Sequence, residues 1–357
     1  MNNLKEERNQ EENNVSRNTV SNMKVLLYAE WLKYISISGI GRAVYHQKKA
    51  LEENNIAYTT DCNDDFDIVH INTLGPKSYL LARKNKKLGK KVIIHAHSTE
   101  EDFRNSFVGS NLASKIFKKW IITVYSLADQ LITPTPYSKR ILLSYGLNPN
   151  IEYISNGIDL KYFKKDIALG QTFREKYGFT KEDKIVIAVG LPIERKGILD
   201  FVELAKRLPK YKFVWCGHVN SLYLPAKVKK VLKNHPKNVH FLGYVEKEMM
   251  RGAYSGSDLF ITLSYEECEG IVLLEALASR QKVLIRDIGA YEGWMSDGVN
   301  CYMAKDNNEF EEKIVGLVEN RLEDLSEKGY EVVKERDITK IGEKLISIYE
   351  ETLNKKH

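Results

Sequence analysis

Short apolar runs alternate with amphipathic stretches along most of the chain. The run at residues 24–30 (KVLLYAE) is typical of a buried strand, and a Gly-containing loop and a helical pattern over residues 42–53 follow it. Similar runs predict further strands at residues 68–72, 91–95, 151–154, 184–190, 211–216, 239–243, 259–263 and 282–286. Strands that alternate with helices indicate parallel sheets covered on both faces. We therefore expect an α/β fold with two doubly wound, Rossmann-like domains facing a central cleft.

The segments between these runs suggest where the domains begin and end. Residues 1–22 are polar and almost free of large apolar side chains, so we expect a disordered tail there. The first domain is predicted over residues 23–165 and the second over 166–335, with a polar crossing before residue 183. A long helix is expected to end at Leu131. A last helix within residues 336–357 follows the second sheet, and the sequence leaves open whether it packs on the second domain or back on the first.

The composition favours one class of partner but does not identify a particular one. Lys plus Arg exceed Asp plus Glu, 54 against 48, which favours anionic partners such as phosphates, nucleic acid or acidic lipid. The four cysteines are far apart, which favours a reducing compartment and makes the cytoplasm the default. No apolar run approaches the roughly 18 residues of a membrane span, so we expect any membrane association to be peripheral.

A loop with acidic residues precedes one predicted helix of the second half. It runs from Ser264 to Gly270, and the helix begins at Ile271. A helix amino terminus offers free N–H groups and a positive dipole end, which suits a diphosphate. Glu267 and Glu275 stand eight positions apart, so both can face a ligand that lies over the helix start. The alternative is that Glu267 complements the dipole and Glu275 forms a surface ion pair.

Two further motifs follow predicted strands. Arg195 and Lys196 follow the strand at 184–190, where adjacent cations can neutralise a departing diphosphate, unless they only form a solvated basic loop. Gly39 lies in a glycine loop, SGIGR. The simpler interpretation of this loop is a plain turn. Val44 occupies the position of the third glycine of a dinucleotide fingerprint, which argues against the rival class, a Rossmann-type oxidoreductase.

No metal site is predicted. Asp65-Phe66-Asp67 matches an Asp-x-Asp metal signature, but it precedes the strand at 68–72 and so lies at the end of the sheet away from the cleft. We find no other His or carboxylate cluster at ligand spacing. We therefore expect the chemistry to require neither a metal nor another cofactor.

The helix expected over residues 112–131 is amphipathic. Its apolar side is expected to carry Leu112, Ile116, Phe117, Trp120, Ile121 and Val124. Lys115, Lys118 and Lys119 lie off that side, and residues 83–91 add basic charge to the same domain. A basic helix with an aromatic residue can lie on an anionic bilayer. A core helix with its lysines in water fits the pattern equally well.

The motifs together resemble a known family. The spacing from Glu267 to Glu275 with EGIVLLEALA, and the segments ERKGI, HAHSTEEDFRNSF, ITPTPYSK and SNGIDL, resemble family 4 retaining glycosyltransferases of the GT-B fold, in particular bacterial synthases of diglycosyl-diacylglycerol. The resemblance runs from about Met23 to the carboxyl end. The chain departs from the usual family pattern at Glu269, where most members have an aromatic residue, and at Leu191, where they have Arg.

The resemblance implies a role for each motif. It places Glu267 on the hydroxyls of the donor hexose, Glu275 on the ribose, and Gly270 and Ile271 near the phosphate or sugar. It implies that Arg195 and Lys196 meet the leaving diphosphate and that Gly39 approaches the donor across the cleft. His97 becomes the active-site histidine, which orients hydroxyls and supports developing positive charge. The expected catalytic residues are thus His97 and Glu267.

The same resemblance implies a reaction and partners. It predicts transfer of glucose or galactose from a UDP-sugar to a membrane glycolipid acceptor, monoglucosyl-diacylglycerol, with retention and without a metal. It makes the first domain the acceptor and membrane-binding domain and the second the donor-binding domain. Lys115, Phe117, Lys118, Lys119 and Trp120 are then expected at an anionic membrane, on its cytoplasmic face, with no nucleic acid partner. A soluble or cell-wall polysaccharide or protein acceptor is the alternative.

Overall fold

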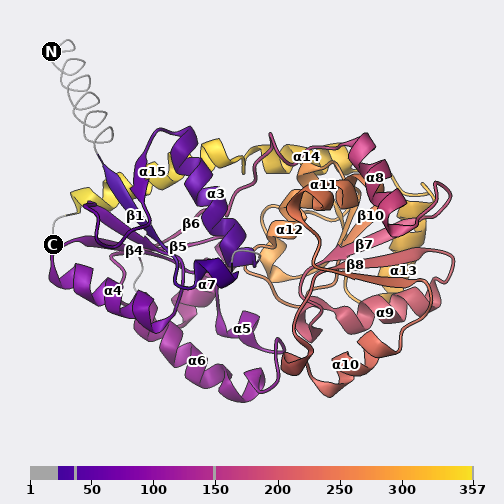
Figure 1. Cartoon of the computed structure of the whole chain (residues 1–357), viewed down its shortest axis with the longest axis horizontal. Coiled ribbons are helices and arrows are strands. Elements are labelled where there is room, and N and C mark those ends of the chain that lie inside the picture. The colour runs from indigo at the N-terminus through magenta and orange to yellow at the C-terminus, as the bar shows by residue number, and fades with distance from the viewer. Residues whose placement is uncertain (1–22, 36–37, 148–149, 356–357) are drawn as a thin grey trace, which may run out of the picture.

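The computed structural model describes residues 23–35, 38–147 and 150–355, which form two lobes side by side (Figure 1). The expected tail, residues 1–22, lies outside the described residues. Each lobe is built on one six-stranded sheet in which every strand pair is parallel. The predicted α/β architecture with two doubly wound domains is confirmed.

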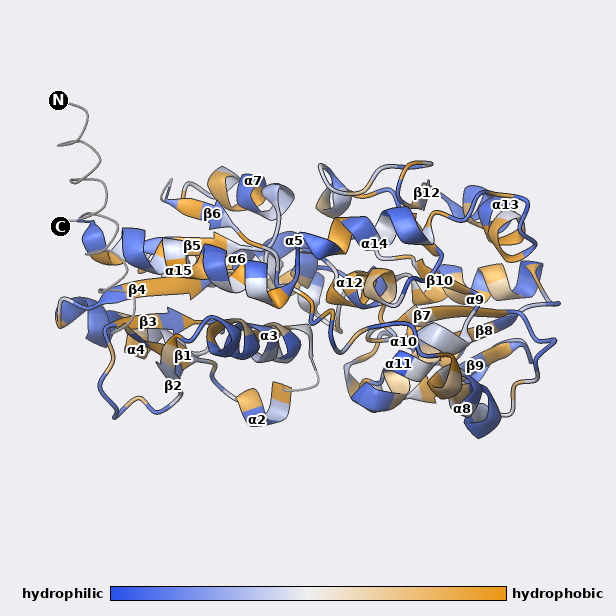
Figure 2. Cartoon of the chain, turned by 90° about the horizontal axis from the view of Figure 1, so that it is seen from above, coloured by the Kyte–Doolittle hydropathy of each residue, from blue (hydrophilic) through white to orange (hydrophobic). Residues whose placement is uncertain are grey.

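The sheet of the first lobe has the strand order β2-β1-β3-β4-β5-β6. Its strands are β1 (Lys24–Tyr28), β2 (Ala57–Thr59), β3 (Ile68–Ile71), β4 (Lys91–His95), β5 (Gln130–Thr133) and β6 (Ile151–Tyr153). All residues of β3, β4 and β5 are buried, as expected for central strands covered on both faces. Figure 2 shows most of β4 in the orange of hydrophobic residues.

Alternate residues of these strands pack against different helices. Val25 and Ile93 face the side covered by α3 (Gly39–Glu53) and α15 (Ile338–Asn354). Leu26 and Ile94 face the opposite side. That side carries α4 (Pro76–Lys87), α6 (Ser110–Tyr125) and α7 (Pro136–Ser144), and the short helices α2 (Leu32–Ile35) and α5 (Glu100–Phe103) complete the lobe.

The last helix, α15, returns from the second lobe to pack on the first, as Figure 1 shows. Its buried residues Ile341, Leu345 and Ile348 join the core of the first lobe. The Tyr349 hydroxyl lies 2.7 Å from His70 Nδ1, and Asn54 Nδ2 donates to the Thr339 carbonyl at 3.0 Å. The end of the chain therefore links the lobes a second time.

The sheet of the second lobe has the order β12-β11-β10-β7-β8-β9. Its strands are β7 (Ile185–Val189), β8 (Lys212–Cys216), β9 (Val239–Gly243), β10 (Leu259–Thr262), β11 (Val283–Arg286) and β12 (Tyr302–Ala304). One face is covered by α9 (Ile198–Arg207), α10 (Ala226–Lys233) and α13 (Asn307–Val318). The other is covered by α8 (Ile167–Tyr177), α11 (Lys247–Gly256), α12 (Ile271–Ala278) and α14 (Ser326–Lys334). Single 3-10 turns are η1 (Glu194–Lys196), η2 (Ser221–Tyr223) and η3 (Gly289–Tyr291).

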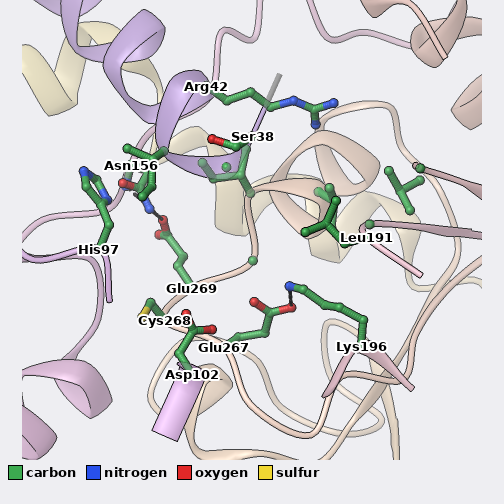
Figure 3. A pocket seen from close by; sticks show the side chains of 18 of the residues that line it. Ser38, Arg42, His97, Asp102, Asn156, Leu191, Lys196, Glu267, Cys268 and Glu269 are labelled. Atoms are coloured by element: carbon green, nitrogen blue, oxygen red, sulfur yellow. Dashed lines mark hydrogen bonds and ion pairs between the residues drawn. The ribbon is translucent and has the colours of Figure 1, made fainter. Parts of the chain in front are cut away.

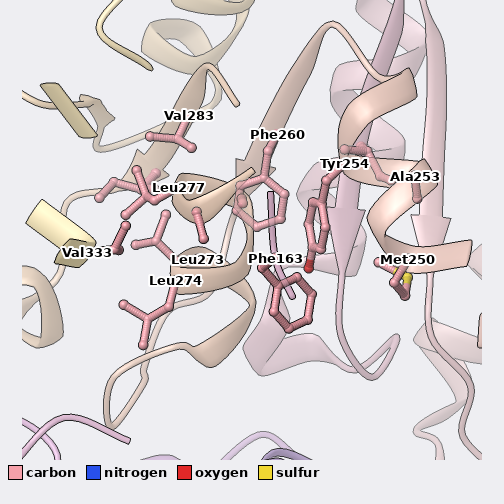
Figure 4. Packing of buried hydrophobic residues seen from close by; sticks show 14 of the residues in the cluster. Phe163, Met250, Ala253, Tyr254, Phe260, Leu273, Leu274, Leu277, Val283 and Val333 are labelled. Carbon is pink, nitrogen blue, oxygen red and sulfur yellow. The ribbon is translucent and has the colours of Figure 1, made fainter. Parts of the chain in front are cut away.

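Helix α12 is held in place by its apolar residues. Figure 4 shows Leu273, Leu274 and Leu277 packed with Phe260 and Tyr254, all of them fully or nearly fully buried. Burial of each large apolar side chain stabilises the fold by about 1.5–3 kcal/mol. The start of α12, beyond the carboxyl end of β10, is thereby fixed at the cleft.

The expected long helix ending at Leu131 is wrong. Helix α6 ends at Tyr125, and residues 130–133 form the strand β5 instead. Between them, Asp129 receives a hydrogen bond from the backbone N–H of Val92, which aligns the new strand with β4. The apolar run before the turn continues the helical period of α6, so the pattern alone gave no boundary. The sequence interpretation also did not include β2, β12, α7 and the helix α8 within the polar crossing.

Helix α7 illustrates how local sequence sets an element. Thr135 and Ser138 form a capping box, and Pro136 occupies the first turn, where its missing N–H has no helical partner to lose. Among the described helices, none has the length and apolar character that a membrane span requires.

Candidate active site

A cavity of about 370 Å³ lies between the two lobes, at the carboxyl ends of the strands (Figure 3). Doubly wound sheets bind ligands at this position. The first lobe contributes Ser38, Gly39, Ile40, Arg42, His97, Ser98, Asp102, Pro134 and Asn156. The second contributes residues 189–191, 195–196, 216–218, 244–245, 250 and 267–272.

The carboxylate of Glu267 is the buried anion of this cavity. Lys196 Nζ donates a hydrogen bond to its Oε1, and Arg195 Nη1 lies 3.8 Å from its Oε2 (Figure 3). Burial alone would raise the pKa of Glu267, but the attraction of Lys196 and Arg195 outweighs it and lowers the pKa below 4.5. Glu267 is therefore an ionised acceptor of hydrogen bonds at neutral pH.

Arg195 connects the lobes rather than facing the cavity freely. Its Nη1 lies 2.7 Å from Asp102 Oδ1 and donates to the Glu266 carbonyl at 2.7 Å. Its Nε donates to Ser106 Oγ at 3.0 Å. Asp102 and Ser106 belong to the first lobe. Arg195 therefore helps to hold the two lobes together. Because the bonds of Arg195 are already made, Lys196 is the cation that can more readily contact a diphosphate.

Glycine at position 197 lets this basic turn approach the donor loop. Gly197 has φ 77°, and a Cβ there would overlap Leu263 at the end of β10. A side chain at this position would push the Arg195–Lys196 turn away from Glu267. The ERKG order is therefore dictated by packing as well as by charge.

The start of α12 presents free backbone N–H groups to the cavity. Gly270 caps the helix with φ 88°, and the first backbone bond is donated by Leu273 to the Gly270 carbonyl. Ile271 and Val272 line the cavity ahead of it. These groups can donate hydrogen bonds to a phosphate or a sugar oxygen.

Glu275 lies in α12 but is not among the described residues that line the cavity. It is buried in α12, and Arg42 Nη1 donates to its two oxygens at 2.7 and 2.8 Å. The buried Tyr254 hydroxyl donates to Oε2 at 2.7 Å. The expectation of a surface ion pair is excluded, because only 2% of the Glu275 side chain is exposed.

Glu269, the departure from the family pattern, holds the lobes together. It is buried and accepts hydrogen bonds from Asn156 N at 2.9 Å and Asn156 Nδ2 at 2.8 Å. Burial raises the pKa of Glu269. Asn156 belongs to the SNGIDL segment of the first lobe, so the two motifs that flank the cavity contact each other directly.

Gly39 borders the cavity at the start of α3. A Cβ built at Gly39 meets no atom of the described residues within 4 Å, so the surrounding protein does not explain the glycine. Ser38 caps the helix by accepting a hydrogen bond from Gly41 N at 3.2 Å. The open space at Gly39 leaves room for a ligand against the backbone.

His97 enters the cavity from the end of β4 and is held by a buried polar network. Its Nε2 lies 2.8 Å from Asn72 Oδ1, which also accepts from Gln47 Nε2 at 2.8 Å. The rings of His97 and His95 stack with centroids 4.2 Å apart. Burial lowers the pKa of His97 to about 3. The imidazole is therefore neutral at physiological pH.

His95 is a buried residue of the first lobe and not a cavity residue. It is buried in β4, with Nδ1 2.9 Å from Gln47 Nε2. Burial lowers the pKa of His95 well below its usual value, and the neighbouring His97 and His70 lower it further.

The far end of the cavity has an apolar character. It is lined by Val189, Leu191, Cys216, Val245 and Met250, with Tyr244 beside them. A flat ring such as a nucleobase can be held between such side chains. The sequence interpretation named only Leu191 among these residues, because hydrophobic positions at strand ends do not differ in pattern from core positions.

Asp65-Phe66-Asp67 stabilises the sheet at its other end. Asp67 Oδ2 accepts from Lys24 N at 2.8 Å, where β1 begins. In the described ranges, no group of three or more His, Cys, Asp or Glu side chains is placed to hold a metal ion.

The helix expected at a membrane, α6, faces differently from the prediction. Phe117 packs on Phe103 with ring centroids 4.2 Å apart, and Trp120 Nε1 donates to the Leu74 carbonyl at 2.7 Å. Lys118 Nζ lies 3.4 Å from Glu100 Oε2. Leu112 and Ile116 instead point to solvent beside Lys115 and Lys119. The prediction of a single apolar side was therefore wrong, because some of its residues are buried in the core and others are exposed on the surface.

Three functional candidates were missed although the sequence contains a signal for each. Arg42 lies in the quoted glycine loop, Asp102 follows His97 in the HSTEEDF segment, and Asn72 is the last residue of a predicted strand. Charged or amide residues at the carboxyl ends of parallel strands meet at one edge of the sheet. That rule identifies Asn72, whereas the partners of Asp102 and Arg42 could not be read from the sequence.

Comparison with known proteins agrees with this geometry. Residues 42–162 match the model of Glycosyltransferase Family 4, and residues 171–336 match that of Glycosyl transferases group 1. The chain is 41% identical over 334 residues to a processive diacylglycerol alpha-glucosyltransferase from Acholeplasma laidlawii, covering 93% of this chain and 99% of the relative. It is 25% identical over 309 residues to an alpha-galactosylglucosyldiacylglycerol synthase from Streptococcus pneumoniae, covering 84% and 81%.

Solved structures show the same fold. HepE from Anabaena, in complex with UDP-glucose, superposes with a TM-score of 0.72 at 16% identity, over 92% of this chain and 100% of that one. One family model matches each lobe, and the relative of 41% identity aligns over nearly the full length. These matches argue against the rival class, a Rossmann-type oxidoreductase. The chain belongs to the family 4 glycosyltransferases of the GT-B fold.

Proposed function

We propose that this glycosyltransferase moves a hexose, glucose or galactose, from a UDP-sugar to a membrane glycolipid, with retention of the anomeric configuration. The observation that carries the proposal is the ionised Glu267 paired with Lys196 at a cleft that His97 enters from the opposite lobe. The relative of 41% identity is named for alpha-glucosyl transfer to diacylglycerol. That name favours glucose over galactose.

The cavity offers a complementary group for each part of the donor. Glu267 accepts hydrogen bonds from the hexose hydroxyls, and Glu275 accepts them from the ribose once Arg42 yields one of its oxygens. The apolar end around Val245 receives the base. The donor then lies along the start of α12 with its diphosphate over Gly270 and Ile271.

The diphosphate is stabilised by fixed charges of the protein. Lys196 and the N–H groups at the start of α12 face the departing phosphate, and Arg195 adds positive potential from behind. These groups replace a divalent ion, so the proposed reaction uses no metal. During transfer the bond from the anomeric carbon to the phosphate oxygen breaks. The oxygen of an acceptor hydroxyl bonds to that carbon on the same face, and its proton passes to the departing diphosphate.

His97 contributes as a neutral hydrogen-bonding group. With a pKa of about 3 it cannot be a cation at neutral pH, so its ring orients hydroxyls and supports the positive charge that develops on the sugar. Asn72 is hydrogen-bonded to the His97 ring, and Gln47 donates to Asn72 and so holds it in place.

The acceptor is proposed to be monoglucosyl-diacylglycerol, which reaches the cleft from the cytoplasmic face of the membrane. The names of both relatives include diacylglycerol, and the basic α4 and α6 of the first lobe supply positive charge for an anionic surface. The enzyme is then a peripheral membrane protein, with Lys115 and Lys119 toward the lipid.

The test is incubation with UDP-glucose or UDP-galactose and either diacylglycerol or its monoglucoside, followed by lipid analysis and NMR of the product. We expect a diglycosyl lipid with an alpha linkage. A beta linkage would contradict retention, and transfer to a soluble polysaccharide or protein but not to lipid would contradict the acceptor.

A further inference from the structure

The second lobe carries a basic, apolar surface that the proposed function does not use. It consists of η2 and α10, residues 220–233, and lies on the same side of the molecule as α4 and α6 (Figure 1). We propose that an anionic bilayer contacts both lobes, and that residues 220–233 form the second half of this contact. The inference rests on the proposed lipid acceptor.

Three segments on this side contain no acidic residue. The sequence contains no Asp or Glu in residues 68–99, 103–128 and 204–245. These segments include α4, α6 and α10. Although Asp and Glu make up nearly half of the charged residues in the chain, 48 against 54 Lys and Arg, none lies on these helices. Such segregation produces a positive potential that attracts anionic lipid.

The lysines of α10 are available for an external partner. Lys229, Lys230 and Lys233 are exposed, and the described residues give none of them an ion pair. Lys227, by contrast, is paired with Glu194. Charges on one helix that have no internal partner interact most strongly with a surface that approaches from outside.

Apolar side chains project from the line where the lobes meet. Val108 is 64% exposed, Leu222 76% and Tyr223 60%, and we call these three residues the junction tip. Leu112 and Ile116 continue the line along α6 at intervals of four residues, 90% and 73% exposed. Scattered exposed apolar residues are common, but a continuous row beside lysines marks an interaction surface.

The junction tip is one unit although its residues come from different lobes. The backbone N–H of Val108 donates to the Tyr223 carbonyl at 3.0 Å. Beside it, Phe107 packs against the core of the second lobe and meets the Tyr223 ring edge-on at 6.5 Å. A bilayer that receives the tip therefore contacts both lobes at a point where they are already bonded.

A lipid surface fits this combination better than a protein or nucleic acid. Basic side chains of this surface flank apolar ones that could enter the interfacial region of a bilayer. Nucleic acid would use the lysines but would leave Leu222 and Leu112 in water. The occupant to which the geometry points is an anionic bilayer.

The experiment compares sedimentation of full-length variants with vesicles of phosphatidylglycerol and phosphatidylcholine, or of phosphatidylcholine alone. One variant carries Lys229→Glu, Lys230→Glu and Lys233→Glu, and a second carries Leu222→Ser and Tyr223→Ser. The matched controls are Lys176→Glu with Lys181→Glu, and Ile167→Ser, all exposed residues in or next to α8 on the opposite side. Circular dichroism confirms folding, which exposed substitutions leave intact.

We expect the charge reversal to weaken binding to anionic vesicles by about tenfold or more, since each basic side chain near such a surface contributes substantially. The tip variant should weaken it severalfold and both controls should bind as the parent does. Equal binding to anionic vesicles by the α10 variant and its control would overturn the inference.

Activity in detergent separates this inference from the proposed function. If the α10 variant transfers hexose to monoglucosyl-diacylglycerol in neutral micelles as fast as the parent but fails on anionic vesicles, both proposals are supported. If the parent transfers no hexose to lipid in either system, the proposed function fails. If both proteins are equally active on vesicles, only the second membrane contact fails.

Discussion

Arg42 Nη1 donates hydrogen bonds of 2.7 and 2.8 Å to the two carboxylate oxygens of Glu275. These bonds connect α3, the helix that begins in the glycine loop of the first lobe, to α12 of the second lobe. This contact gives Glu275 two tasks: it joins the lobes, and it is the proposed acceptor of the ribose hydroxyls. The Arg42 side chain remains 26% exposed, so its guanidinium can move when a ligand enters.

Replacing Glu275 by Gln should therefore affect both donor use and stability. A hydrogen bond to a charged group is worth about 1.5–3 kcal/mol, so we expect kcat/KM for the donor to fall by about ten- to a hundredfold. The melting temperature should also fall modestly, because Arg42 loses its partner. Donor titration and thermal denaturation measure the two effects. An unchanged donor KM would contradict the ribose assignment.

Replacing Lys196 by Ala should change the pH dependence as well as the rate. In the parent, ion pairing holds the pKa of Glu267 below 4.5, so this group stabilises the fold above pH 4.5 and loses that effect as the pH falls through its lower folded pKa. Without Lys196, burial dominates and the pKa rises. We expect kcat to fall and its acid limb to move to higher pH.

The control for this measurement is Lys206→Ala, which removes an exposed cation that, within the described part of the chain, pairs only with Glu203. It should leave both the rate and the pH profile unchanged. A Lys196→Ala enzyme with a reduced rate but the acid limb of the parent would show that Lys196 does not set the ionisation of Glu267.

Replacing Asn72 tests the orientation of His97. The Asn72→Ala change removes the partner of His97 Nε2, and we expect kcat to fall by about tenfold with donor KM little changed, the value of one ordinary hydrogen bond. Asn72→Asp should instead raise the pKa of His97 from about 3, because a carboxylate favours the imidazolium. A pH titration by NMR would detect this shift, which a purely structural role of Asn72 would not produce.

The sequence predicts the sheets well because buried parallel strands are short apolar runs. Lys91–His95 and Val239–Gly243 have the predicted bounds, and most other strands differ by one or two residues. It failed between Tyr125 and Gln130, where one apolar period runs through a helix end and a strand start. The local pattern does not show where the helix ends and the strand begins. That boundary is fixed by the hydrogen bond that the backbone N–H of Val92 donates to the Asp129 carboxylate.

The site was predictable in part for the same reason. Residues in a motif after a strand, such as Glu267, Lys196 and His97, could be assigned to the cleft from their positions. Their partners could not, because Arg195 contacts Asp102 and Glu275 contacts Arg42 across the two lobes. Such pairs depend on how the lobes meet, and one sequence does not encode that in any local pattern.

Transfer should continue in excess EDTA. The groups facing the proposed diphosphate are Lys196 and the N–H groups at the start of α12, which supply the positive charge that a divalent ion supplies in other enzymes. We expect the rate in the presence of excess EDTA to equal the rate without it. Loss of activity that Mg²⁺ or Mn²⁺ restores would show a metal requirement.

Trp120 and Ile116 should separate fold stability from membrane binding, although they lie on one helix. Trp120 donates to the Leu74 carbonyl and packs against Tyr79, whereas Ile116 is 73% exposed. Trp120→Ala should lower the free energy of unfolding by about 2–3 kcal/mol, less than the ~3–5 kcal/mol of a fully buried aromatic residue. Ile116→Ser should leave stability unchanged and weaken binding to anionic vesicles, because it removes apolar contact area without disturbing the core. Chemical denaturation and vesicle sedimentation measure the two properties independently. If Trp120→Ala keeps the parent stability and loses vesicle binding, then Trp120 is an interfacial residue, and the inward orientation of this part of α6 is wrong.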